Sequence, residues 1–181
     1  GAGCSFVARA LDSDRKGLDE TLTTAAHHRG TSFVEIYQNC PIFNDGAFDD
    51  YKGPEAAERI VRLVDGEPIL LGADRSKGVV RDPVNGSLTV TEVAQVGMDH
   101  VVVHDATRPD PSLAFELAHL HDSGQISQIP LGILRSVSLP TYDDMVRDQL
   151  RLAGGSADDK PARDAALQQL LRGNDTWQVH N

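Results

Sequence analysis

The chain has few of the features that mark several common protein classes. Among its 181 residues are two cysteines, Cys4 and Cys40, and a single tryptophan. Two cysteines cannot form a disulfide scaffold, and they suit a reducing, cytoplasmic compartment. No apolar run approaches the roughly 18 residues that a membrane span needs. No basic and then apolar leader opens the chain, so nothing in the sequence favours secretion.

Basic residues are also scarce relative to acidic ones. Lys plus Arg number 17 and Asp plus Glu number 27, which makes the formal net charge −10. An acidic surface repels phosphate backbones, and the densest basic pair, Arg15 and Lys16, is surrounded by acidic residues. The charge pattern therefore argues against nucleic-acid binding. The hydrophobic content of 40% is that of an ordinary globular chain and supports a packed core.

The N-terminal residues have the pattern of a strand–helix–strand unit. Residues 5–11 are apolar-rich and residues 31–37 are β-branched and aromatic. Between them, apolar residues recur on one helical face, with Asp12 and Ser13 as N-cap candidates. Short connections of this kind predict a crossover between two parallel strands. Because parallel sheets carry their functional loops at the carboxyl ends of strands, residues 38–46 are where chemistry is expected.

Beyond residue 50 the pattern predicts a mixture of helices and strands. The strongest signal is a hairpin around Asn85-Gly86, and a second turn is expected at Asp65-Gly66. The remaining expectations are helices over residues 54–61, 111–121, 142–152 and 161–171, strands over 100–104 and 131–137, and Leu113, Leu117 and Leu120 facing inward.

Two other motifs suggest metal sites but fail on spacing. Residues 12–17 begin like an EF-hand loop, yet Lys16 and Thr23 occupy positions that need oxygen ligands. Helix capping explains this segment better. His100 and His104 share one side of a predicted strand, but they would lie roughly 13 Å apart, too far for one ion. No zinc site is expected.

Cys40 lies just past the carboxyl end of the second predicted strand and precedes Pro41. Pro41 lacks a backbone N–H and restricts Cys40 to an extended conformation, which fixes the direction of the thiol. The residues alone leave three interpretations open: a buried inert thiol, a reactive nucleophile, or a single ligand of a metal cluster. A nucleophile needs a nearby base, so the inert thiol leads on the residues alone. Cys4 is expected to be a small core residue.

The segment around Cys40 also resembles a known family, which changes that ranking. The run FVEIYQNCPIFN at residues 33–44 is similar to the segment of 2-oxoacid:ferredoxin oxidoreductase beta subunits in which a cysteine follows a strand and precedes Pro-x-Phe-Asn. Residues 5–9, 13–16 and 44–48 resemble the 2-oxoglutarate-using branch, and residues 78–83, 134–137 and 173–177 resemble its C-terminal extension. The resemblance covers essentially the whole chain, and the Cys-Pro segment is its specific functional motif.

The resemblance implies an α/β fold in two parts. Residues 1–49 would be the last βαβ unit of a parallel-sheet thiamine-diphosphate-binding domain, and residues 50–181 a mixed α+β C-terminal extension that docks a partner subunit. The missing initiator Met and the strand-like run near residue 4 are typical of an internal piece of a longer protein. The family's Gly-Asp-Gly motif and Cys-x-x-Cys pair are absent from this chain. Thiamine diphosphate and Mg²⁺ would therefore be bound mainly by residues outside it.

By resemblance, Cys40 is the fourth ligand of a [4Fe-4S] cluster, and Cys4 has no ligand role. The implied activity is oxidative decarboxylation of 2-oxoglutarate to succinyl-CoA and CO₂, with coenzyme A accepting the succinyl group. Electrons would pass through the cluster to ferredoxin, in a cytoplasmic complex with an alpha subunit and without nucleic acid or membrane. The chain alone is expected to be inactive. Two alternatives stay open: action on pyruvate or another 2-oxoacid, and a non-catalytic docking module over residues 50–181.

Overall fold

The computed structural model describes residues 3–120, 128–154, 159–174, 177 and 179. The chain divides into two compact units, Gly1–Leu139 and Pro140–Asn181, which we call the sheet unit and the C-terminal helical unit. Each is described by itself below.

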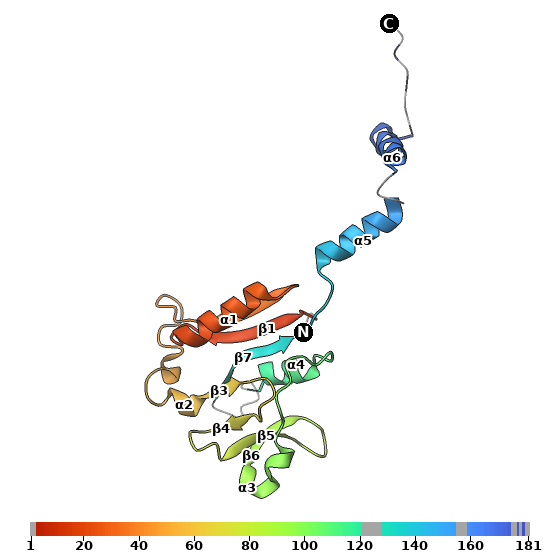
Figure 1. The fold of residues 1–181 in the computed structure, drawn as a ribbon. Coiled ribbons are helices and arrows are strands. Elements are labelled where there is room, and N and C mark those ends of the chain that lie inside the picture. The colour runs from red at the N-terminus through yellow and green to blue at the C-terminus, as the bar shows by residue number, and fades with distance from the viewer. Residues whose placement is uncertain (1–2, 121–127, 155–158, 175–176, 178, 180–181) are drawn as a thin grey trace. The chain divides into compact units, whose positions relative to one another are not determined.

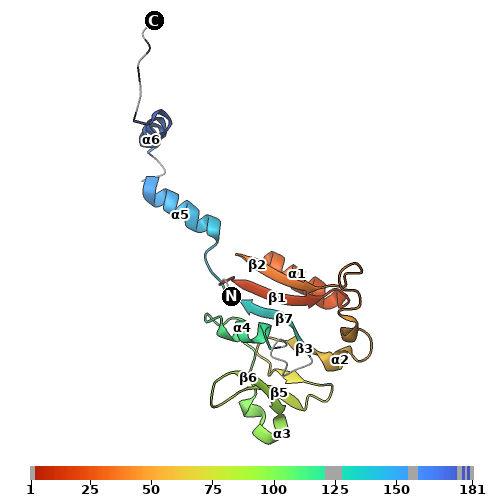
Figure 2. The same ribbon diagram turned by 180° about the vertical axis from the view of Figure 1, so that it is seen from behind.

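The sheet unit begins with the predicted strand–helix–strand crossover. Strand β1 (Phe6–Leu11), helix α1 (Arg15–His27) and strand β2 (Ser32–Tyr37) follow one another, and the two strands are parallel. Helix α1 covers one face of this pair (Figures 1 and 2), where Phe6, Ala8 and Ala10 are buried. The crossover prediction is confirmed.

The residue that caps α1 differs from the expected one. Asp14, rather than Asp12 or Ser13, accepts a hydrogen bond from the Gly17 N–H at 3.1 Å and pairs with Arg62 at 2.7 Å. Partial burial by itself would raise the pKa of Asp14. The hydrogen bonds from Arg62 and Gly17, together with the Arg62 and Lys16 charges, outweigh burial and hold that pKa below its ordinary value. Asp14 is therefore a charged cap.

Four strands form the larger sheet in the order β2-β1-β7-β3. Strand β7 (Ile129–Ser136) runs antiparallel to β1 and parallel to β3 (Ile60–Leu63), so the sheet is mixed. The backbones of β7 and β3 approach closely at Gly132, which has φ +121°. A Cβ there would lie 2.8 Å from the Leu63 carbonyl oxygen. Residues before and after position 50 share this sheet. The division between residues 49 and 50 stays a prediction about domains.

A smaller antiparallel sheet contains the predicted hairpin. Strands β5 (Lys77–Arg81) and β6 (Leu88–Glu92) pair across the turn at Gly86, which has φ +74° as such turns require. The Asp65-Gly66 turn leads from β3 into this second sheet rather than closing a hairpin. The elements are β4 (Leu70–Leu71), β5 (Lys77–Arg81), β6 (Leu88–Glu92) and helix α3 (Val93–Val96).

Two predicted elements are wrong in extent. The strand expected over residues 100–104 is instead a 3₁₀ turn, η2 (Met98–His100), followed by isolated bridges from Val101 to Val80 and from Val103 to Pro68. Because the two valines bridge different partners, no continuous strand forms. The helix expected over 54–61 shortens to α2 (Ala56–Arg59), which follows the 3₁₀ turn η1 (Asp49–Tyr51). The residues after α2 enter β3, where Val61 is buried.

The main core lies between the two sheets and helix α4 (Ser112–Ala118). Leu113, Leu117 and Leu120 are buried there, as predicted. Helix α4 ends before the expected boundary, and residue 121 lies outside the described residues. The other members are Val61, Leu63, Ile69, Leu71, Val79, Leu88 and Leu134. In both views α1 and the smaller sheet lie on opposite sides of β7 (Figures 1 and 2).

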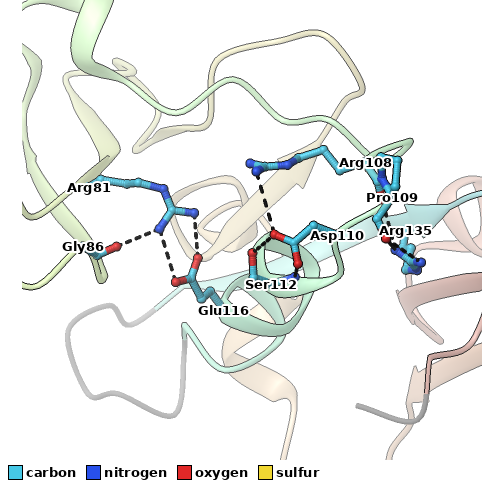
Figure 3. Close-up of polar contacts among 8 residues, drawn as sticks. All are labelled: Arg81, Gly86, Arg108, Pro109, Asp110, Ser112, Glu116 and Arg135. Carbon is cyan, nitrogen blue, oxygen red and sulfur yellow. Dashed lines mark hydrogen bonds and ion pairs between the residues drawn. The ribbon is translucent and has the colours of Figure 1, made fainter.

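Polar side chains fix α4 and the segment before it (Figure 3). Arg135 of β7 is buried and donates hydrogen bonds to the carbonyl oxygens of Cys4, Arg108 and Pro109 at 3.0–3.2 Å. Arg81 of β5 pairs with Glu116 of α4 at 2.8 Å. These contacts connect α4 and its preceding loop to both sheets.

The C-terminal helical unit contains α5 (Tyr142–Gly154) and α6 (Lys160–Arg172), in agreement with prediction. Asp159 caps α6 by accepting a hydrogen bond from the Ala162 N–H, and Pro161 stands in the first turn. No side chain described in this unit is buried. Among the described residues of the whole chain, no helix combines the length and apolar character needed to cross a membrane.

Candidate functional site

The predicted position for chemistry is the loop that follows β2. Residues 38–48 follow the carboxyl end of β2, which lies beside that of its parallel neighbour β1, and Cys40 is the third residue of this loop. The thiol is free and only half-buried. Cys40 is thus placed at the carboxyl edge of the sheet, where its side chain is accessible to a ligand.

Cys40 opens a tight turn of the backbone. The Asn44 N–H donates to the Cys40 carbonyl oxygen at 2.9 Å, which closes the turn over residues 41–43. The backbone N–H groups of Phe43 and Ile42, and to a lesser extent that of Asn44, stabilise the thiolate and lower the pKa of Cys40, while desolvation acts in the opposite direction and is outweighed. Converging N–H groups of this kind favour an anion. The loop therefore favours the thiolate, the form that binds metals and attacks electrophiles.

The loop is closed by the side chain of Asn39. Its Nδ2 donates to Asp45 Oδ1 at 2.9 Å, and its Oδ1 accepts from the Gly46 N–H at 2.8 Å. The backbone N–H of Asn39 donates to Asp12 Oδ2 at 3.2 Å. The sequence does not reveal these contacts, because it indicates a helix cap at Asp12 and includes Asn39 only in the motif around Cys40.

The histidines considered as bases lie at the other edge of the sheet. His28 Nε2 is 3.0 Å from Ser5 Oγ, just before β1 begins, and His27 Nδ1 is 2.8 Å from the Thr23 carbonyl oxygen. Cys40 lies beyond the opposite ends of these strands, roughly 20 Å away along a six-residue strand. Neither histidine is placed to activate Cys40, which weakens the nucleophile interpretation.

The second cysteine has a different environment. Cys4 is half-buried, and its thiol donates to the carbonyl oxygens of Phe6 and Thr31, each at 3.1 Å. It lies at the entrance to β1 and is not one of the core residues that we expected it to join. It is also at the edge of the sheet opposite Cys40.

The chemistry available to this chain at Cys40 is that of one thiolate. Among the described residues, no three His, Cys, Asp or Glu side chains gather as a group that could hold a metal ion. A cluster with four thiolate ligands would therefore take the other three from outside the described part of the chain. Ile42 and Phe43, beside Cys40, expose 84% and 89% of their surface, so the turn presents an apolar tip.

Comparison with known proteins gives a long match and two short ones. The chain is 48% identical over 179 residues to 2-oxoglutarate oxidoreductase subunit KorB of Mycobacterium tuberculosis, covering 99% of this chain and 46% of that protein. Over 44 residues it is 39% identical to a 2-oxoacid:ferredoxin oxidoreductase subunit beta of Sulfolobus and 41% identical to 2-oxoacid:ferredoxin oxidoreductase 2, subunit beta, of Aeropyrum pernix. These matches cover 24% of this chain and 14% of each relative. No family model matches.

A solved structure is similar in fold. It is the 2-oxoglutarate:ferredoxin oxidoreductase from Magnetococcus marinus with 2-oxoglutarate, coenzyme A and succinyl-CoA bound. The TM-score is 0.51 at 21% identity, over 90% of this chain and 40% of that chain. This likeness supports the mixed α/β fold. The chain spans about half the length of its long match, so the matched proteins contain much that this chain does not.

Proposed function

Because this chain belongs to the family of 2-oxoacid:ferredoxin oxidoreductase beta subunits, we propose that it forms part of the beta subunit of a 2-oxoglutarate:ferredoxin oxidoreductase. The 48% identity over nearly the whole chain to a 2-oxoglutarate oxidoreductase subunit carries this proposal. The reaction is oxidative decarboxylation: 2-oxoglutarate loses CO₂, coenzyme A takes the succinyl group, and two electrons leave one at a time for ferredoxin.

Cys40 supplies one thiolate to a [4Fe-4S] cluster in this proposal. Three observations support it: the thiol is accessible at the carboxyl edge of the sheet, backbone N–H groups stabilise its anion, and no described histidine of α1 is near enough to make it a nucleophile. Thiolates are the usual ligands of such clusters, and hydrogen bonds to their sulfurs adjust the reduction potential. The chain holds and tunes the electron relay and does not contact substrate through Cys40.

The remaining cofactors depend mainly on residues outside this chain. Thiamine diphosphate, bound with Mg²⁺, supplies the electron sink for decarboxylation. The β1–α1–β2 crossover is the last βαβ unit of the domain that binds it, and the loop after β2 brings Cys40 to the edge where the electrons leave. The chain by itself is inactive. Calorimetric titration of the 181-residue chain with thiamine diphosphate and Mg²⁺ should show no binding, and micromolar affinity would contradict this point.

A second role, docking of the alpha subunit, is favoured by the C-terminal helical unit. Leu167, Leu170 and Leu171 form an i, i+3, i+4 stripe on α6, and each exposes more than half of its surface. In α5, Tyr142 and Leu152 expose 78% and 75%. Helices of this length are marginal in water without tertiary contacts, so this unit is suited to fold against a partner. Docking and catalysis are compatible within one subunit.

The complete heteromeric enzyme tests the catalytic proposal. We expect CoA-dependent reduction of ferredoxin with 2-oxoglutarate and slower reduction with pyruvate; the reverse order would assign another 2-oxoacid. Cys40→Ser replaces a soft thiolate by a hard oxygen and should lower iron content or shift the cluster potential while thiamine diphosphate stays bound. Cys4→Ser is the matched control and should leave the cluster intact. Full iron and an unchanged potential in Cys40→Ser would refute the ligand assignment.

A further inference from the structure

The loop that presents Cys40 depends on one side-chain amide for its closure. Asn39 uses its donor and its acceptor on two successive residues, bonding Asp45 at 2.9 Å through Nδ2 and the Gly46 N–H at 2.8 Å through Oδ1. Its backbone N–H is held by Asp12 at the end of β1, at 3.2 Å. The far end of the loop is thereby tied to the sheet directly beside Cys40.

The residue types at both ends suit this closure. An amide provides a donor and an acceptor on one rigid plane, whereas a carboxylate at position 39 would face the Asp45 carboxylate and lose the donor. Gly46 has φ +76°, a left-handed conformation that glycine adopts without steric cost, and a Cβ there would lie 3.1 Å from Asp49 Oδ2. A glycine at this position therefore lets the chain turn and present its N–H to Asn39.

We propose that Asn39 is a positioning residue for the Cys40 sulfur. By tying Asp45 and Gly46 to the strand end, it keeps closed the turn over residues 41–43, in which the Asn44 N–H donates to the Cys40 carbonyl oxygen and the N–H groups of Ile42 and Phe43 lie near the sulfur. Loss of the amide lets the turn open and removes those hydrogen bonds. The inference rests on the proposed function in one respect: the positioned sulfur serves a cluster.

Two measurements test separately whether Asn39 closes the loop and whether that closure affects the Cys40 sulfur. The first is amide hydrogen exchange of residues 40–46 in the full 181-residue chain, which needs no cluster. Asn39→Ala should speed exchange at Ile42 and Phe43, and Asp45→Ala should do so less, because the bond to Gly46 remains. Asn85→Ala removes an amide from the β5–β6 turn, where it accepts from the Ser87 N–H, and is the matched control. It should leave exchange in residues 40–46 unchanged.

The second readout is the cluster reduction potential in the complete heteromeric enzyme. Hydrogen bonds to cluster sulfurs raise the potential, so Asn39→Ala should shift it to more negative values with near-normal iron content. Asp45→Ala should give a smaller shift of the same sign, and Asn85→Ala none. A purely structural role would lower stability without moving the potential of the folded enzyme.

The outcomes are distinct. Faster exchange together with a negative shift supports the proposal. If amide exchange is unchanged in Asn39→Ala, Asn39 does not close the loop. If exchange is faster but the cluster reduction potential is unchanged, Asn39 does not position the sulfur. Absence of iron from the wild-type complex would instead overturn the proposed function, and the exchange experiment would still decide whether Asn39 closes the loop.

Discussion

The buried guanidinium of Arg135 provides a quantitative test of how the sheet unit is held together. Arg135 exposes 7% of its surface and donates four hydrogen bonds, one to the carbonyl oxygen of Cys4 and three to those of Arg108 and Pro109. Figure 3 shows the contacts with Arg108 and Pro109. Replacement by methionine keeps most of the side-chain volume and removes every donor. The carbonyl groups then lose their partners and the start of β1 is released from the loop before α4.

The magnitude follows from the number of contacts and their exposure. A hydrogen bond to a charged group contributes about 1.5–3 kcal/mol net. Arg108 and Pro109 are exposed, so their carbonyl groups can be rehydrated after the substitution. We therefore expect Arg135→Met to lower the free energy of unfolding by about 2–4 kcal/mol, well below the sum over all four bonds. Typical domains have only about 5–15 kcal/mol in total.

Urea denaturation of the full chain, followed by far-UV circular dichroism, measures this loss. Arg135→Lys keeps the charge but not the planar fork, so it should recover less than half of the stability. The control is Arg81→Met, which breaks a half-exposed pair with Glu116 and a hydrogen bond to the Gly86 carbonyl oxygen, and which should cost about 1 kcal/mol. If Arg135→Met costs no more than Arg81→Met, the reasoning from buried donors is wrong.

Three further perturbations test the cap, the sheet and the loop. Asp14→Ala removes the α1 cap and the Arg62 pair and should cost about 1–2 kcal/mol near pH 7. Because the pKa of Asp14 is lowered in the folded state, the part of this cost that depends on the carboxylate charge should shrink progressively as the pH falls below about 4, as denaturation curves at several pH values will show. Gly132→Ala places a Cβ 2.8 Å from a β3 carbonyl oxygen at φ +121° and should lower stability by at least about 1–3 kcal/mol, visible as a reduced Tm. In a Cys4→Ser background, the rate of alkylation of Cys40 should persist to a lower pH in the folded chain than in urea as the pH is decreased, because the folded chain keeps the thiolate to a lower pH. Coincident pH profiles would contradict the lowered pKa.

The elements predicted correctly are those specified by neighbouring residues. The crossover of β1, α1 and β2 follows from apolar periodicity and short connections, and the β5–β6 hairpin follows from Asn85-Gly86. The helices α5 and α6 have local signals as well, including Pro161 in the first turn of α6. Each of these elements is specified by residues that lie close together in the sequence.

The strand pairings that could not be predicted are those between distant parts of the chain. Strand β7 lies between β1 and β3, antiparallel to one and parallel to the other, although about 120 residues separate β7 from β1 along the chain. Hydropathy indicates that β7 is a strand and carries no information about its neighbours. The segment around Val101 fails for a related reason, because its apolar alternation serves bridges to two different partners. Arg135 similarly shows no sequence pattern, since its partners are backbone carbonyl groups.

The same distinction applies to the candidate site: the location of Cys40 could be predicted from the sequence, whereas the chemical role of Cys40 could not. Its location at the carboxyl edge of a parallel pair follows from the local crossover, so that part was predictable. The chemistry of its sulfur depends instead on which backbone N–H groups face it, and every residue except proline has an N–H. What aims those groups is the closure of the loop by Asn39 on Asp45 and Gly46, six and seven residues along the chain. The reactivity of Cys40 is thus a property of the closed loop rather than of the Cys-Pro pair, and substitutions that leave the cysteine in place but open the loop should change it.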